Sequence, residues 1–150
     1  MSAPPRHSVS LFALLALSAC APQSLEDLPQ PALVVVVTEG GGFCSGVNAV
    51  DASGTPWREN GCMERSSGFT PRERLVDDAT RAELDALMDT VLALPDDGDC
   101  LVPSPSARRY RFVRTGGGEG AGETRQCEPG VAEPARELAG RLEMLSDPDR

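Results

Sequence analysis

Residues 78–94, DATRAELDALMDTVLAL, predict an amphipathic helix, and its place between two stretches of strand-like sequence decides the fold. Thr80 and Glu83 have the spacing of a capping box, and Pro95 ends the helical pattern. Apolar residues recur at the i, i+3, i+4, i+7 and i+8 spacing that places them on one helix face. These residues are Leu84, Leu87, Met88, Val91 and Leu92.

Strands are expected before this helix. ALVVVVTE, residues 32–39, contains four consecutive valines and predicts a core strand. Residues 46–53 and 57–63 flank a Gly-Thr-Pro turn and predict a hairpin. Residues 72–76 are expected to add one short strand. The hairpin residues expected to point inward are Val47, Ala49 and, less regularly, Val50.

A second hairpin and a second helix are expected after the first helix. ARRYRFVRT, residues 107–115, and ETRQC, residues 123–127, flank a glycine-rich loop. Residues 132–146 have Pro134 early and then Leu138, Leu142 and Leu145 on one face, which predicts a helix. Two hairpin units, each followed by an amphipathic helix, predict an α+β fold, with an antiparallel sheet and helices packed on one face.

The N-terminal residues 1–19 have the features of a secretory signal peptide. Their apolar run is about half the roughly 20 residues that a membrane span needs. The end of this segment, Leu17-Ser18-Ala19-Cys20, resembles the lipobox of bacterial lipoproteins. The resemblance implies that Cys20 becomes the N-terminus and carries acyl chains such as palmitate, which anchor the protein to a membrane. The alternative is an unmodified signal peptide, cleaved near Ala19 or Ala21, in which Cys20 is incidental.

These features predict three segments. Residues 1–19 form the signal peptide, residues 20–31 form the lipidated cysteine and a proline-rich extended tether, and residues 32–150 form one disulfide-stapled α+β domain. We therefore expect an exported protein of the bacterial cell envelope, lipid-anchored on the periplasmic side or at the surface.

Four further cysteines predict disulfides, because an even number in an exported chain of this size usually forms them. Cys44 and Cys62 are nearly equidistant from the first hairpin turn, so we expect them to pair. Cys100 and Cys127 then remain for each other, brought together by the segment LVPSPSA folding back beside the second strand. Zinc is the alternative, but no cysteine pair has the ligand spacing of a zinc site, so no metal is assigned.

The formal charge is −9, and removal of residues 1–19 leaves 13 arginines against 23 carboxylates. An acidic surface of this kind argues against nucleic acid as a partner. The only dense basic group is Arg108, Arg109 and Arg111 around Tyr110. On one strand these residues are expected to alternate between the two faces of the sheet rather than form a binding stripe.

The available side chains restrict catalysis. The chain has no lysine, and its single histidine, His7, lies in the predicted signal peptide. Nucleophiles activated by histidine, lysine-based catalysis and histidine metal sites are therefore excluded within the mature chain. We assign no catalytic residue and no cofactor. The remaining enzymatic alternative is a hydrolase that uses paired carboxylates on envelope glycans.

Three local patterns have a structural and a functional interpretation. Residues 115–123, TGGGEGAGE, contain a form of the dinucleotide fingerprint, but no helix start follows, so a hairpin loop is favoured. Residues 95–100, PDDGDC, contain three aspartates that could hold calcium, but a turn that ends the helix is favoured. Trp57 could be an exposed anchor for a partner, although a place at the edge of the core is favoured.

Residues 32–145 are also similar, in the order of their expected elements, to a group of uncharacterised bacterial exported α+β proteins. The shared order is a glycine-bearing hairpin, a helix that begins near Thr-x-x-Glu, a second hairpin and a short final helix. This resemblance implies a compact domain and transfers no functional residue. We therefore expect a non-enzymatic envelope interaction module that binds another protein, in the manner of a small protease inhibitor if residues 40–46 form a braced exposed loop.

Overall fold

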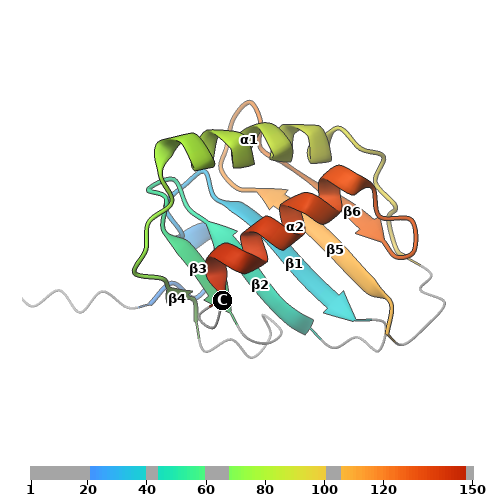
Figure 1. Ribbon diagram of the computed structural model, residues 1–150, viewed down its shortest axis with the longest axis horizontal. Coiled ribbons are helices and arrows are strands. Elements are labelled where there is room, and N and C mark those ends of the chain that lie inside the picture. Colours follow the sequence, from blue (N-terminus) through green and yellow to red (C-terminus); the bar gives the residue numbers. More distant parts are fainter. Residues whose placement is uncertain (1–20, 40–43, 60–67, 101–105, 148–150) are drawn as a thin grey trace, which may run out of the picture.

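The computed structural model describes residues 21–39, 44–59, 68–100 and 106–147. Six strands and two helices follow one another in the order β1-β2-β3-β4-α1-β5-β6-α2, after a single turn of 3-10 helix at Leu25–Asp27 (Figure 1). Their bounds are β1 Leu33–Glu39, β2 Cys44–Val50, β3 Pro56–Glu59, β4 Thr70–Pro71, α1 Asp78–Leu92, β5 Arg108–Arg114, β6 Gly122–Cys127 and α2 Glu133–Ser146.

The strands form one antiparallel sheet in the order β4-β3-β2-β1-β5-β6. The valine-rich β1 lies at its centre, where Val35 is opposite Asn48 on one side and Phe112 on the other. Both helices cover the same face of the sheet (Figure 1). The predicted α+β fold, with two strand units each followed by a helix, is therefore confirmed.

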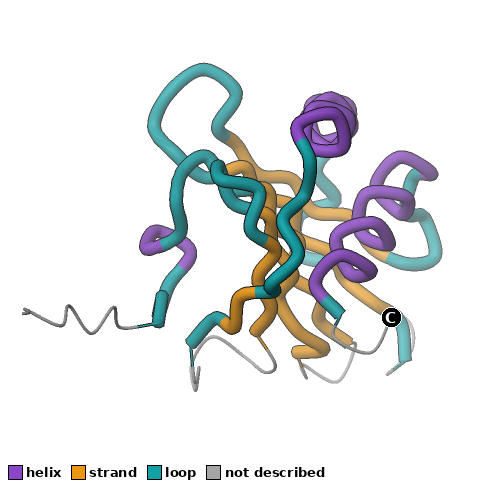
Figure 2. Tube along the Cα trace, turned by 60° about the vertical axis from the view of Figure 1, so that its left-hand side comes forward, coloured by secondary structure: helices purple, strands orange, loops and turns teal. Residues whose placement is uncertain are grey.

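The other face of the sheet is covered by the N-terminal segment, and Figure 2 shows the sheet between this segment and the helices. Leu25 and Leu28 are buried in a core with Val34 and Phe69. The Phe69 amide also donates a hydrogen bond of 2.9 Å to the Pro22 carbonyl. The expected extended tether over residues 21–31 is thus corrected, because buried leucines and backbone hydrogen bonds hold this proline-rich segment against the sheet.

The two faces of the sheet divide the hydrophobic core. Leu33, Val35, Val50 and Phe112 pack under the helices, whereas Val34, Val47 and Ala49 belong to the opposite core. All three residues that were expected to point inward, Val47, Ala49 and Val50, are buried. They lie on different faces because side chains alternate along a strand, and the sheet is covered on both sides.

The start of α1 differs from the prediction. The expected capping box of Thr80 and Glu83 is wrong, because the N-cap is Asp77, whose carboxylate accepts a 2.8 Å hydrogen bond from the Thr80 amide. The expected strand over residues 72–76 is also wrong. The pairing strand β4 comprises only Thr70 and Pro71, and the chain then leaves the sheet to reach α1.

The second hairpin agrees with the prediction, with β5 and β6 joined by the glycine-rich loop. Arg108 and Tyr110 lie on the helix-covered face, whereas Arg109 and Arg111 lie on the other face. This alternation confirms that the basic group forms no single stripe. Buried Arg114 donates hydrogen bonds to α1 and to the Gly120 carbonyl, which attaches the loop to the helix.

Candidate binding groove

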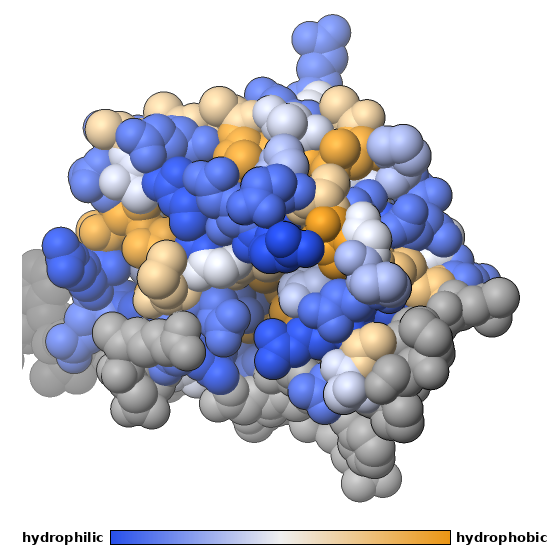
Figure 3. Space-filling model, turned by 45° about the vertical axis from the view of Figure 1, so that its right-hand side comes forward, coloured by the Kyte–Doolittle hydropathy of each residue, from blue (hydrophilic) through white to orange (hydrophobic). Residues whose placement is uncertain are grey.

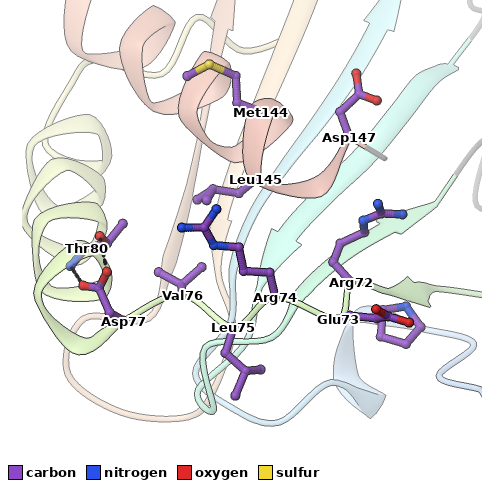
Figure 4. A pocket seen from close by; sticks show the side chains of 11 residues that line it. Arg72, Glu73, Arg74, Leu75, Val76, Asp77, Thr80, Met144, Leu145 and Asp147 are labelled. Atoms are coloured by element: carbon purple, nitrogen blue, oxygen red, sulfur yellow. Dashed lines mark hydrogen bonds between the residues drawn. The ribbon is translucent and has the colours of Figure 1, made fainter. Parts of the chain in front are cut away.

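A groove of about 710 Å³ lies between the loop that joins β4 to α1 and the C-terminal end of α2 (Figure 4). Arg72 and Arg74 of the loop lie on one side, and Met144 and Leu145 of α2 lie on the other. The loop leaves the sheet after Pro71, where the Arg72 amide donates to the Pro56 carbonyl at 2.8 Å. The groove is therefore formed by a chain segment between regular elements and by the last turn of a helix.

The groove contains two arginines whose charge is not neutralised within the described residues. Figure 4 shows the side chains of Arg72 and Arg74 directed toward the end of α2. No ion pair joins either guanidinium to a carboxylate in the described parts of the chain. By contrast, Asp147 at the same groove pairs with Arg58 at 3.5 Å. Glu73 and Asp77 also line the groove, so the two arginines supply the positive charge of a wall of mixed charge.

Two exposed apolar side chains flank the groove. Leu75 is 60% exposed and Met144 is 54% exposed, and they are the large exposed hydrophobic residues of the described chain. Leu75 points away from α2, on the loop side of the groove (Figure 4). An apolar side chain beside an arginine is a common composition of protein-binding surfaces.

Asp77, a carboxylate that lines the groove, has a structural task as the N-cap of α1. The hydrogen bond from the Thr80 amide lowers the pKa of Asp77 below its ordinary value of 3.8. Elsewhere, a hydrogen bond from Arg111 lowers the pKa of Glu123, and the Gln23 amide lowers the pKa of Asp27. A glycosidase needs one carboxyl group with a raised pKa as its general acid. These three shifts go in the opposite direction, so they give the glycan-hydrolase alternative no support.

The structure contains the expected disulfide between Cys100 and Cys127, whose Cα atoms are 5.9 Å apart. Residues 96–99 lie beside β6 next to Cys100, whereas most of LVPSPSA, the segment expected to fold back there, lies outside the described residues. The Asp97 amide donates to the Arg125 carbonyl at 3.0 Å, and the Asp97 carboxylate accepts from the Cys127 amide at 2.9 Å. The acidic turn therefore pairs with the edge of β6, and the described residues contain no cluster of metal-ligating side chains.

The other predicted cysteines stay untested. Cys20 and Cys62 lie outside the described residues, and Cys44 is the first residue of β2. The lipidation of Cys20 and the pairing of Cys44 with Cys62 thus remain predictions.

Trp57 lies at the edge of a core, in agreement with the favoured interpretation. It packs against the core on the face opposite the helices and is half-buried. Its indole N–H donates a 2.7 Å hydrogen bond to the Asp51 carboxylate. The same carboxylate accepts from the Ser53 and Thr55 amides, so Asp51 holds together the first hairpin turn.

The residues of the groove were not singled out from the sequence. Arg72 and Arg74 alternate with other residues in the manner of a strand. The sequence therefore predicted a strand where the structure has a loop. Met144 belongs to a predicted helix, but its exposure depends on how α2 packs. Two closely spaced arginines in an acidic chain were the one feature of the sequence that could have pointed to the groove.

No protein-family model matches the chain, and no curated protein matches it. Within the described residues, neither helix has both the length and the apolar composition that a membrane span requires. The function must therefore be inferred from the chemistry of the surface.

Proposed function

We propose that the protein is a lipid-anchored binding module of the bacterial cell envelope, and that its groove holds an acidic segment of another envelope protein. The observation that carries this proposal is the presence of Arg72 and Arg74, without ion pairs in the described chain, between exposed Leu75 and Met144. The proposed module has no catalytic activity of its own.

The chemistry of the groove specifies the partner. Two guanidinium groups favour carboxylates, with which arginine forms paired hydrogen bonds. The exposed side chains of Leu75 and Met144 favour an apolar residue beside the acidic ones, because its contact with them removes apolar surface from water. A segment in which acidic and apolar residues alternate would meet both requirements.

The proposed location rests on the N-terminal sequence. A lipobox cysteine carries two or three acyl chains, and two chains are what stable membrane anchoring requires. The protease-inhibitor form of the proposal places contacts in residues 40–46, of which residues 40–43 lie outside the described chain. The groove supports binding of a protein segment without reference to that loop.

The test is site-specific photo-crosslinking in the native envelope. A photoreactive amino acid at position 75 of the full-length protein should give a crosslinked product whose partner peptide is rich in Asp and Glu. Arg72→Glu together with Arg74→Glu should abolish this product, since the groove then repels the acidic segment. Arg111→Glu with Arg125→Glu is the matched control, because it makes the same charge change on the opposite face of the sheet.

The result that supports the proposal is loss of the product in the groove variant and its retention in the control. Equal crosslinking in both variants would show that the contact does not depend on the groove arginines. A partner peptide without acidic residues would also contradict the proposal.

A further inference from the structure

A second hollow, of about 220 Å³, lies under α2 on the helix-covered face of the sheet. It is separate from the groove and lies farther along α2 toward the helix start. Figure 3 shows a largely hydrophilic surface on the side of the molecule that it presents, with hydrophobic residues visible between the hydrophilic ones. The hollow has polar side chains from the sheet and from the helix.

Three arginines from three different elements line this hollow. They are Arg58 from β3, Arg108 from β5 and Arg136 from α2, and the only carboxylate among the described lining residues is Glu143. The guanidinium groups of Arg58 and Arg136 are oriented by partners within the chain, and Arg136 also donates to the Val131 carbonyl at 3.2 Å. Arg58 pairs with Asp147 at 3.5 Å and Arg136 with Glu133 at 3.1 Å.

The third guanidinium is oriented by a phenol. A hydrogen bond from Arg108 to the Tyr110 hydroxyl raises the pKa of this arginine above its ordinary value, and Tyr110 itself lines the hollow. A guanidinium group has five N–H donors, so Arg108 and Arg136 keep donors for a ligand after these contacts, and Arg58 adds positive charge. The three arginines thus supply an anion site that is oriented before any ligand arrives.

The buried side chain of Asn48 supplies the second, independent observation. Asn48 is 6% exposed, lines the hollow and has no hydrogen-bond partner for its Oδ1 atom within the described residues. An unpaired buried acceptor is costly, and native proteins rarely contain one without a reason. A ligand that offers an N–H or O–H donor would satisfy this oxygen.

Gly140 supplies a third observation. It lies inside α2, where glycine lowers helix stability relative to alanine. A Cβ atom at this position would meet no atom within 4 Å, so packing does not require glycine. Its absent side chain instead keeps the wall of the hollow open.

We propose that this hollow binds a small α-amino acid. The three arginines hold the carboxylate, because a guanidinium matches a carboxylate with two parallel hydrogen bonds. The ammonium group donates to Asn48 Oδ1 and is neutralised by Glu143. A volume of about 220 Å³ restricts the ligand to a small molecule, since sites for drug-sized ligands are roughly 300 to 1,000 Å³.

The experiment uses the full-length protein in lipid nanodiscs with its single tyrosine labelled with ¹³C. Tyr110 is the only tyrosine and lines the hollow, so its ring signals report binding there. Trp57, the only tryptophan, packs on the opposite face and reports folding by its fluorescence. The probes are L-alanine, D-alanine, lactate, acetate and inorganic phosphate.

The expected result is a saturable shift of the Tyr110 signals with an alanine enantiomer, at a concentration at least tenfold lower than with acetate. Lactate should bind more weakly than alanine, because its hydroxyl group lacks the charge that Glu143 complements. Gly140→Leu should abolish the shift by filling the hollow, and Arg108→Gln should weaken binding about tenfold. Arg111→Gln, on the opposite face of the same strand, is the control and should leave binding unchanged.

Several results would overturn the proposal. The first is the absence of a saturable shift with either alanine enantiomer. The second is phosphate or acetate binding as tightly as alanine, which would make the hollow a general anion site. The third is an unchanged affinity in Arg108→Gln, since this exposed substitution leaves the core intact.

Discussion

Arg58 and Asp147 form an ion pair of 3.5 Å that joins β3 to the residue after α2. Arg58 lines the hollow under α2, and Asp147 lines the groove at the end of the helix. The two candidate sites therefore share one electrostatic contact, and we expect a charge change in one site to affect the other.

The first prediction concerns this shared contact. Asp147→Asn removes an anion that competes for the Arg58 guanidinium, so alanine binding in the hollow should strengthen by about threefold. Arg58→Gln should weaken it by about tenfold. The pair is partly exposed, so the free energy of unfolding should change by only about 0.5 kcal/mol in Asp147→Asn. Titration of the Tyr110 signals measures both affinities, and equal affinities in the two variants would contradict the coupling.

The second prediction concerns the start of α1. Asp77→Ala removes the N-cap acceptor and should lower the melting temperature by a few degrees. Asp77→Asn is the matched variant, because asparagine caps helices about as well as aspartate without a charge.

The pH dependence of this effect follows from the lowered pKa of Asp77. Its ionised form stabilises the fold above the ordinary value of 3.8, and this contribution is lost as the pH falls through the lower folded-state pKa. Thermal melts of wild type and Asp77→Asn should therefore converge as the pH falls through this folded-state pKa. A constant difference between wild type and Asp77→Asn at all pH values would refute this assignment.

The third prediction tests the packing of the N-terminal segment. Leu28 is 1% exposed, so Leu28→Ala should lower the free energy of unfolding by about 3 kcal/mol. Leu75→Ala makes the same change at an exposed position and should cost less than about 0.5 kcal/mol. Urea unfolding distinguishes the two, and similar midpoints would mean that residues 21–31 are a tether after all.

The fourth prediction concerns the disulfide. Cys100 and Cys127 are separated by 27 residues, and in the chain-entropy model a loop of that length gives about 3.5 kcal/mol of stabilisation. Cys100→Ser with Cys127→Ser should lose most of this amount in urea unfolding. Non-reducing peptide mapping should also show Cys44 joined to Cys62, and a peptide linking Cys44 to Cys100 would contradict both pairings.

The fifth prediction concerns the anchor. Cys20→Ser removes the acyl acceptor, so the protein should leave the membrane fraction or accumulate as an uncleaved precursor. Membrane fractionation and mass spectrometry of the N-terminus measure these outcomes. Normal processing with unchanged membrane retention would exclude the lipoprotein interpretation.

The sequence was informative wherever a local pattern matches a local structure. The periodicity of α1 and the glycine-rich turn between β5 and β6 were predicted because neighbours in the chain determine both. The pairing of Cys100 with Cys127 followed once the other two cysteines were placed on the first hairpin.

The candidate sites depend on contacts that no local pattern reveals. Arg74 and Met144 line one groove although about seventy residues separate them in the chain. Asn48 alternates with valine and alanine like any strand residue, and only the position of α2 turns it into a buried, unpaired acceptor. Leu25 and Leu28 lie among prolines and acidic residues, which obscured their role in the core.

The contact between the acidic turn and β6 has a consequence for association between copies of this protein. An exposed sheet edge invites pairing with a neighbouring chain. Here Asp96 and Asp97 accept hydrogen bonds from the outward amides of Arg125 and Cys127, and the opposite edge, β4, has only two residues. Within the described residues, neither edge therefore offers a long row of unpaired amides to the sheet of a second copy, and edge-to-edge pairing is disfavoured.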